Sequence, residues 1–142
     1  MMNIKPTSKN LKILAKAIKQ VLINRDETTY MQELLGYKSN PLKNECYVAS
    51  KLLYDMMRGN GISLYKKKDA YDKWHYWLKT DEGETIDITA EQYVIEGVEV
   101  PSSSYKDALE AEALWYPSYK DRIKQLHSEL IEYINVNNLE LD

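Results

Sequence analysis

The stretch from Asn44 to Arg58 constrains the fold more than any other part of the sequence. Its apolar residues cover most sides of a helix instead of forming one stripe, and they are Tyr47, Val48, Ala49, Leu52, Leu53, Met56 and Met57. A helix that is apolar on most sides is stable only when other elements cover it. Gly59-Asn60-Gly61 follows and is expected to end it. The sequence therefore predicts a buried central helix that carries Cys46 in its first turn.

Further helices are expected on both sides of this one. An N-terminal helix is predicted over Ser8–Ile23, capped by Ser8, with an apolar face formed by Leu11, Leu14, Ala15, Ile18 and Leu22. A short second helix follows Asp26 and stops at Gly36. The last long helix begins at Pro117, and its apolar face is Tyr119, Ile123, Leu126, Leu130 and Ile134. Shorter helices are expected near Thr89–Gln92 and after Ser104-x-x-Asp107, which resembles a capping box.

The β part of the chain is short. Strands are predicted at Ile62–Tyr65, Trp74–Lys79, Thr85–Ile88 and Val98–Val100, and the basic run Lys66-Lys67-Lys68 is expected to form a solvated loop. The chain shows no internal repeat and no linker long enough to divide it. We therefore expect residues 1–142 to form a single α+β domain, which is long enough to bury a core.

Charge and cysteine content exclude several classes of protein. The formal net charge of −3 argues against nucleic acid as a partner, because phosphate binding needs a concentrated positive surface. A lone cysteine cannot form an internal disulfide, and no apolar run is long enough for a signal peptide or a membrane span. The cytoplasm is the expected location. One cysteine and two distant histidines do not have the spacing of a metal site, and no cofactor is expected.

Cys46, His75 and Asp87 are the candidate catalytic residues. A cysteine nucleophile needs a stabilised thiolate, a base to receive its proton and a third group to orient that base. The first turn of a helix favours negative charge because its backbone N–H groups are unpaired, and Cys46 occupies such a turn. His75 lies inside a predicted strand, where its ring can be held rigidly beside the helix.

The loop of the predicted hairpin decides whether His75 and Asp87 share a face of the sheet. A three-residue loop, Asp81-Glu82-Gly83, puts Trp77 opposite Asp87 and His75 diagonal to it on the same face. A two-residue loop would put His75 and Asp87 on opposite faces. Gly83 suits the positive φ that the three-residue loop requires, so we predict the first arrangement.

The order of these residues along the chain is a cysteine on a helix, a histidine on a strand and an aspartate on the next strand. Papain-like and transglutaminase-like folds have this order, with the thiol on a helix that faces a small antiparallel sheet. The predicted fold is therefore a papain-like or transglutaminase-like α+β core, in which the central helix packs on the sheet and further helices are added at the N- and C-terminal ends.

A series of short motifs points to a known family. They are Asp26-Glu27-Thr28-Thr29, Asn40-Pro41, Cys46 with Ala49, Gly59 to Gly61, His75-Tyr76-Trp77, and Ile86-Asp87-Ile88-Thr89 with Gln92. Together they resemble the YunG family of small bacterial and phage proteins, over roughly Ile18 to Leu126. The resemblance implies a papain-like fold with Cys46, His75 and Asp87 at the triad positions. It implies no particular substrate.

One position departs from the family pattern. The family usually places Gly-Gln directly before its cysteine, whereas this chain has Asn44-Glu45. An ionised glutamate cannot donate a hydrogen bond, so Glu45 would not serve in an oxyanion hole. We expect Asn44, together with the backbone N–H of Cys46, to take that role. Trp77 is expected to contact the substrate.

Each candidate residue also has a purely structural explanation. A cysteine on an apolar helix is most often a small core residue. His75 between two tryptophans fits a half-buried sheet position, and Asp87 fits the cap of the helix near Thr89, a role that is compatible with catalysis. His127 is expected on the surface of the last helix.

Two functions of different classes are consistent with the sequence. The first is a cysteine hydrolase or acyl transferase that acts on an amide, isopeptide or thioester bond of a peptide-like or small-molecule substrate. The second is a non-catalytic phage or bacterial protein that uses the same cleft to hold a small ligand or a host or defence protein. A hyper-reactive Cys46 favours the first, and an inert buried thiol favours the second.

Overall fold

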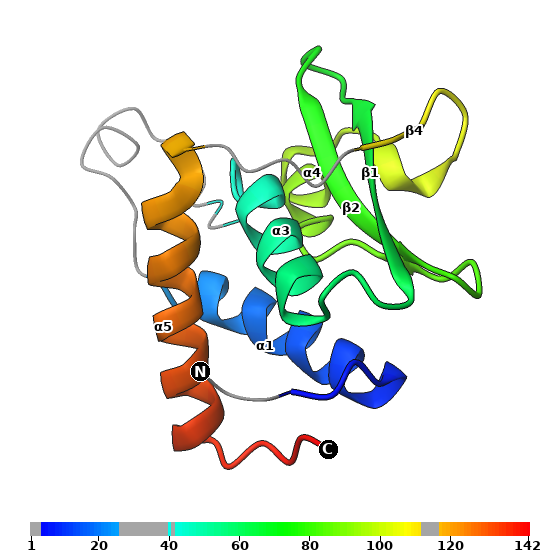
Figure 1. The fold of residues 1–142 in the computed structure, drawn as a ribbon. Coiled ribbons are helices and arrows are strands. Elements are labelled where there is room, and N and C mark those ends of the chain that lie inside the picture. Colours follow the sequence, from blue (N-terminus) through cyan, green and yellow to red (C-terminus); the bar gives the residue numbers. More distant parts are fainter. Residues whose placement is uncertain (1–3, 26–39, 41, 112–116) are drawn as a thin grey trace, which may run out of the picture.

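The chain folds as an α+β structure in which helices pack beside one small antiparallel sheet (Figure 1). The computed structural model describes residues 4–25, 40, 42–111 and 117–142. Its helices are α1 (Ser8–Asn24), α3 (Cys46–Met56), α4 (Glu91–Glu96) and α5 (Lys120–Val136), with short 3-10 turns at Pro101–Ser103 and Pro117–Tyr119. Its strands are β1 (Ile62–Lys68), β2 (Trp74–Thr80), β3 (Thr85–Ile86) and β4 (Leu109–Glu110). The predicted second helix, residues 26–36, lies outside the described residues.

The sheet has the strand order β3-β2-β1-β4, and each neighbouring pair is antiparallel. β1 and β2 pair along their whole length, from Ile62 opposite Thr80 to Lys68 opposite Trp74. The predicted solvated loop at Lys66–Lys68 is therefore wrong, because these lysines belong to β1. The ammonium groups of Lys66 and Lys68 lie 4.5 and 4.6 Å from the centre of the Trp74 ring. Such cation–π contacts favour lysine at these two strand positions.

The hairpin between β2 and β3 has the predicted three-residue loop. The backbone N–H of Thr80 donates to the carbonyl of Glu84 (2.8 Å), and Gly83 adopts a φ of 89°. Leu78 then pairs with Ile86, which confirms the predicted register. β3 is shorter than expected, however, and pairs only with Leu78 and Lys79 of β2. It leaves the edge of β2 nearer to His75 uncovered by a strand.

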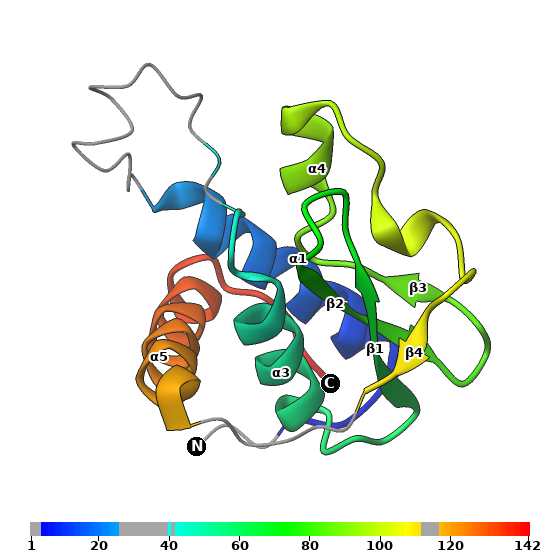
Figure 2. The same cartoon turned by 90° about the horizontal axis from the view of Figure 1, so that it is seen from above.

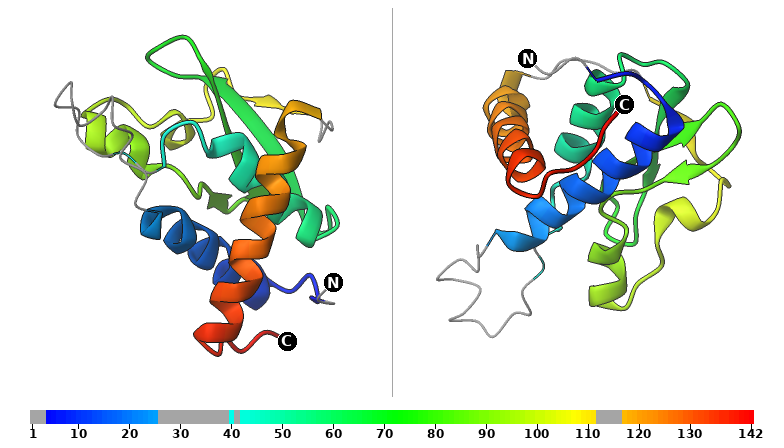
Figure 3. Two further views of the ribbon diagram at one scale, coloured as in Figure 1. Left: turned by 90° about the vertical axis from the view of Figure 1, so that its left-hand side faces the viewer. Right: turned by 90° about the horizontal axis from the view of Figure 1, so that it is seen from below.

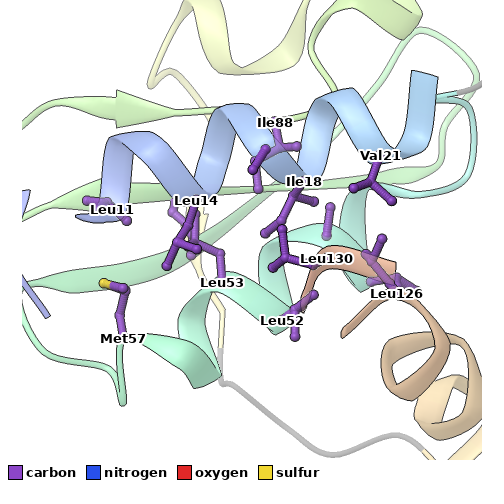
Figure 4. Close-up of a cluster of buried hydrophobic side chains, with 14 of the residues drawn as sticks. Leu11, Leu14, Ile18, Val21, Leu52, Leu53, Met57, Ile88, Leu126 and Leu130 are labelled. Atoms are coloured by element: carbon purple, nitrogen blue, oxygen red, sulfur yellow. The ribbon is translucent and has the colours of Figure 1, made fainter. Parts of the chain in front are cut away.

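α3 is the central helix, as its apolar sequence predicts. In Figures 1 and 2 it lies between α5 and the sheet, and α1 packs against both α3 and α5. Figure 4 shows the resulting core, in which side chains from three helices meet. Residues of this core with no exposed surface include Leu14, Ile18, Leu53, Leu126 and Leu130.

The C-terminal segment returns from α5 to the start of α1 (Figure 3). The backbone N–H of Asp142 donates to the side-chain oxygen of Asn10 (2.9 Å), and the amide of Asn10 donates back to the Asp142 carbonyl (3.1 Å). Helix α1 begins at Ser8 as predicted, but its cap is Thr7 instead of Ser8, because the Thr7 hydroxyl accepts from the N–H of Asn10. Reciprocal hydrogen bonds thus join the two ends of the described chain.

Two predictions between α4 and α5 are wrong. Residues Val98–Val100 form no strand, and the predicted helix after Ser104 is replaced by a turn and the strand β4. Ser104 does accept a hydrogen bond from the N–H of Lys106, as a local cap would. Pairing of Leu109 and Glu110 with the free edge of β1 then takes the chain out of helical geometry. The edge of the sheet outweighs the local helix signal here.

Candidate active site

Cys46 is the first residue of α3, and it faces the uncovered edge of β2. Its Sγ lies 3.9 Å from the backbone carbonyl oxygen of Trp74, to which it donates. Ser50, one helical turn later, donates from Oγ to the carbonyl of Tyr76 (3.3 Å). Side chains of α3 therefore satisfy two carbonyls along the edge that β3 leaves uncovered. This packing fixes the thiol, which is half-buried, directly beside the backbone of His75.

His75 is completely buried in β2, and its ring is held from three sides. Nε2 lies 2.8 Å from Oδ2 of Asp87. The indole of Trp77 stacks against the ring, with 5.9 Å between centroids, and Tyr93 meets it edge-on at 4.9 Å. Among the described residues Nδ1 has no hydrogen-bond partner. It is the ring nitrogen that remains for the thiol of Cys46.

Asp87 follows β3 directly, and its side chain is 5% exposed. Oδ2 accepts from His75 and also from the hydroxyl of Ser102, at 2.5 Å. Helix α4 begins with Ala90 at its N-cap and has no side-chain capping bond, so the Asp87 carboxylate does not cap it. The hairpin register therefore directs Asp87 to the imidazole and away from the helix.

The electrostatics of the site favour a protonated imidazole. Burial alone would lower the pKa of His75, but the contacts and charges of Asp87, and then of Cys46, outweigh it and raise that pKa to about 9. The Sγ of Cys46 sits outside full hydrogen-bonding geometry with Nδ1 and donates to Trp74 instead. The Cys46 side chain is nevertheless close enough to the imidazole to help raise its pKa.

A cavity of about 380 Å³ opens over Cys46. Five of its lining residues are aromatic, and they are Tyr47, Trp74, Tyr76, Tyr93 and Tyr119. The others besides Cys46 are polar, and they are Asn44, Asp69, Lys73, Gln92 and Arg122. Asn44 thus lines the same cavity as Cys46, and its role at an oxyanion stays a prediction. Trp77 does not line this cavity, because its indole is wholly buried between the rings of His75 and Tyr65.

Glu45 points away from the thiol and into an ion-pair network. Its carboxylate pairs with Arg122 of α5 (3.1 Å) and with Arg25 at the end of α1 (3.8 Å), and Arg25 also pairs with Glu129 (2.8 Å). Arg122 further donates to the backbone carbonyl of Asn44 (2.9 Å). Glu45 therefore anchors the start of α3 to the two neighbouring helices, and it does not line the cavity.

Three residues that contact the site were not predicted from the sequence. One is Ser102, described above, and the other two are Asp69 and Tyr93, which bond to each other. The Tyr93 hydroxyl donates to Asp69 (2.8 Å), which also accepts the N–H groups of Tyr71 and Lys73. Burial and the bond with Asp69 raise the pKa of Tyr93. Burial would raise the pKa of Asp69, but the hydrogen bonds that its carboxylate accepts outweigh burial and hold that pKa below the ordinary value. For these three residues, the turn at 69–73, in which Asp69 accepts two nearby backbone N–H groups, is the only feature that a local sequence pattern could have indicated.

The described residues contain neither a metal-binding cluster nor a helix that could span a membrane. No group of three or more His, Cys, Asp and Glu side chains in them could hold a metal ion. None of the helices in the described ranges is long and apolar enough to cross a membrane.

Comparison with known proteins identifies a family. Neither the curated proteins nor the solved structures gave a match. The family described as YunG protein matches residues 10–135, which include Cys46, His75 and Asp87. The chain belongs to the YunG family.

Proposed function

We propose that this protein is a cysteine hydrolase or acyl transferase that acts on an amide, isopeptide or thioester bond. The observation that carries the proposal is the pairing of buried His75 with Asp87 at 2.8 Å, beside a cysteine that starts a helix and lines an open cavity. A thiolate, a base and an orienting carboxylate are the three groups that such chemistry requires. Here they come from α3, from β2 and from the residue that follows β3.

In the proposed reaction Nδ1 of His75 takes the proton of Cys46, and Sγ attacks the carbonyl carbon of the substrate. In this proposal the backbone N–H of Cys46, with Asn44 on the cavity wall, stabilises the oxyanion. His75 then gives its proton to the leaving amine or thiol, and an acyl-enzyme remains on Sγ. Water or a second nucleophile releases the acyl group after His75 removes its proton. Asp87 holds the ring through Nε2 in every step.

A papain-like arrangement is part of this proposal. The thiol at the start of a helix and the imidazole on an antiparallel strand beside it support that comparison. The register of the β2–β3 hairpin also allows Asp87 to act as the third member of such a triad. The cavity volume and its aromatic walls suit a short peptide-like segment or a small molecule with a planar acyl group.

The rate at which iodoacetamide alkylates Cys46 tests the proposal. His75→Gln keeps an N–H donor for Asp87 but cannot take the proton of the thiol. We expect it to slow alkylation at pH 7 by at least about tenfold, because a free cysteine is only a few per cent thiolate there. His127→Gln, on α5, removes the other histidine and should leave the rate unchanged. Equal rates in the wild type and His75→Gln would contradict the proposal.

The aromatic walls of the cavity favour one alternative. Five aromatic side chains around a site of this size suit a non-catalytic role, in which the cavity holds a small ligand or a side chain of a partner protein. In that case Cys46 should alkylate no faster than a cysteine in a denatured chain. Its Sγ would then serve only the packing against Trp74.

A further inference from the structure

Ser102 contacts Asp87 of the proposed catalytic pair from the connection that follows α4. It lies in the 3-10 turn Pro101–Ser103, and its Oγ is 2.5 Å from Oδ2 of Asp87. This is the same oxygen atom that accepts from Nε2 of His75. One carboxylate oxygen therefore joins two donors, whereas the other, Oδ1, is buried with no partner among the described residues.

From this geometry we infer that Ser102 is a positioning residue, the fourth member of a Cys46–His75–Asp87–Ser102 site. A carboxylate that is 5% exposed depends on hydrogen bonds to replace water. With one donor on Oδ2, the carboxylate can rotate and offer either oxygen to the imidazole. With two donors on the same atom, only one orientation satisfies both. Ser102 acts through Asp87 and does not touch the substrate cavity.

The turn that carries Ser102 is itself fixed to the sheet. Lys67 pairs with His75 across β1 and β2, and its ammonium group donates to the carbonyl of Ser104 (3.2 Å). Pro101 is buried at the start of the turn and limits its backbone freedom. Strand β1 thus supports both the strand that carries His75 and the turn that carries Ser102. Lys67, in the basic run of the sequence, therefore has a structural role.

The experiment compares Ser102→Ala with Ser103→Ala. Ser103 lies in the same turn, and its hydroxyl donates only to the turn's own backbone at Val100 (2.6 Å). Two readouts are used: the NMR titration of His75, assigned with the aid of His127→Gln, and the pH profile of Cys46 alkylation by iodoacetamide. Without the Ser102 hydroxyl, the Asp87 carboxylate can rotate and holds the imidazolium of His75 less well. We therefore expect Ser102→Ala to lower the titration midpoint of His75 and to slow alkylation at pH 7 by about tenfold. Ser103→Ala should match the wild type.

A second pair of variants separates the hydroxyl from the shape of the side chain. Ser102→Thr keeps the hydroxyl, whereas Ser102→Val has the same branched shape without it. We expect Thr to restore the wild-type titration and rate, and Val to behave like Ala. If Ser102→Ala does not fold, the comparison of Ser102→Thr with Ser102→Val still tests whether the hydroxyl positions Asp87. Equal titrations and rates for Thr and Val would overturn the inference.

This inference rests on the proposed function, but the two fail in different ways. If His75→Gln leaves alkylation unchanged, the proposed hydrolase is wrong, while a shifted His75 titration in Ser102→Ala still supports Ser102 as the residue that positions Asp87. If His75→Gln slows alkylation and Ser102→Ala matches the wild type in both readouts, the inference about Ser102 is wrong and the proposed function stands.

Discussion

Asp87 acts on His75 through its charge as well as through the hydrogen bond to Nε2. Asp87→Asn keeps the shape of the side chain but removes the charge. Because that charge helps to raise the pKa of His75 to about 9, we expect the variant to lower this pKa. Alkylation of Cys46 at pH 7 should become slower for the same reason. NMR titration of His75 and iodoacetamide kinetics measure the two effects.

Asp72 offers a matched control for this substitution. It lies in the loop between β1 and β2, its side chain is 91% exposed, and solvent screens its charge. Asp72→Asn removes the same charge from the chain and should change neither the titration of His75 nor the alkylation rate. If Asp87→Asn behaves like Asp72→Asn in both measurements, Asp87 does not orient the imidazole.

The site residues that could be predicted depend on local patterns in the sequence, whereas those that could not be predicted depend on contacts between separate segments of the chain. The positions of Cys46, His75 and Asp87 follow from a helix start and a hairpin register, both of which are local properties of the chain. Ser102 reaches Asp87 only through the path of the connection after α4, which no local pattern encodes. Strand alternation placed Trp77 on the face of His75. It could not predict that the Tyr65 ring covers that face.

At the scale of elements, the β2–β3 loop determines which face of the sheet Asp87 joins. Gly83 has a φ of 89°, where a side chain is strained, although a Cβ there would meet no atom within 4 Å. We expect Gly83→Ala to lower the free energy of unfolding by about 1 kcal/mol through backbone strain alone. Urea denaturation measures this. Glu82→Ala, at the preceding loop position, is the control and should stay within about 0.5 kcal/mol of the wild type. An equal effect of the two substitutions would show that the loop does not depend on the positive φ.

Periodic elements were predicted well and edge elements poorly, for a physical reason. α1 and α5 each carry an apolar face at helical spacing, and α3 is apolar on most sides. Burial of these apolar surfaces stabilises each helix wherever it docks. β4 has two residues and exists only because β1 offers an unpaired edge. The lysines of β1 likewise join the strand because β2 and Trp74 lie opposite. Such elements depend on partners that are far away in sequence.

At the scale of the whole molecule, the start of α3 is the point where helices and sheet are joined. Glu45 ties it to α1 through Arg25 and to α5 through Arg122, while Cys46 contacts the edge of β2. A thiol held by this junction has a fixed position relative to His75. The core that surrounds α3 therefore supports the geometry of the proposed site.

The pKa of His75 consequently makes the stability of the whole chain depend on pH. A histidine in the unfolded chain titrates near 6.5, whereas in the folded chain the pKa of His75 is about 9. The folded state binds this proton more tightly, so the stabilisation is complete below about pH 6.5 and is lost as the pH rises through about 9. We expect urea midpoints of the wild type to fall over this interval more steeply than those of His75→Gln. Cys46→Ser should show an intermediate slope, because Asp87 still pairs with the imidazole. Identical slopes in the wild type and His75→Gln would mean that the buried imidazole is neutral throughout this pH range.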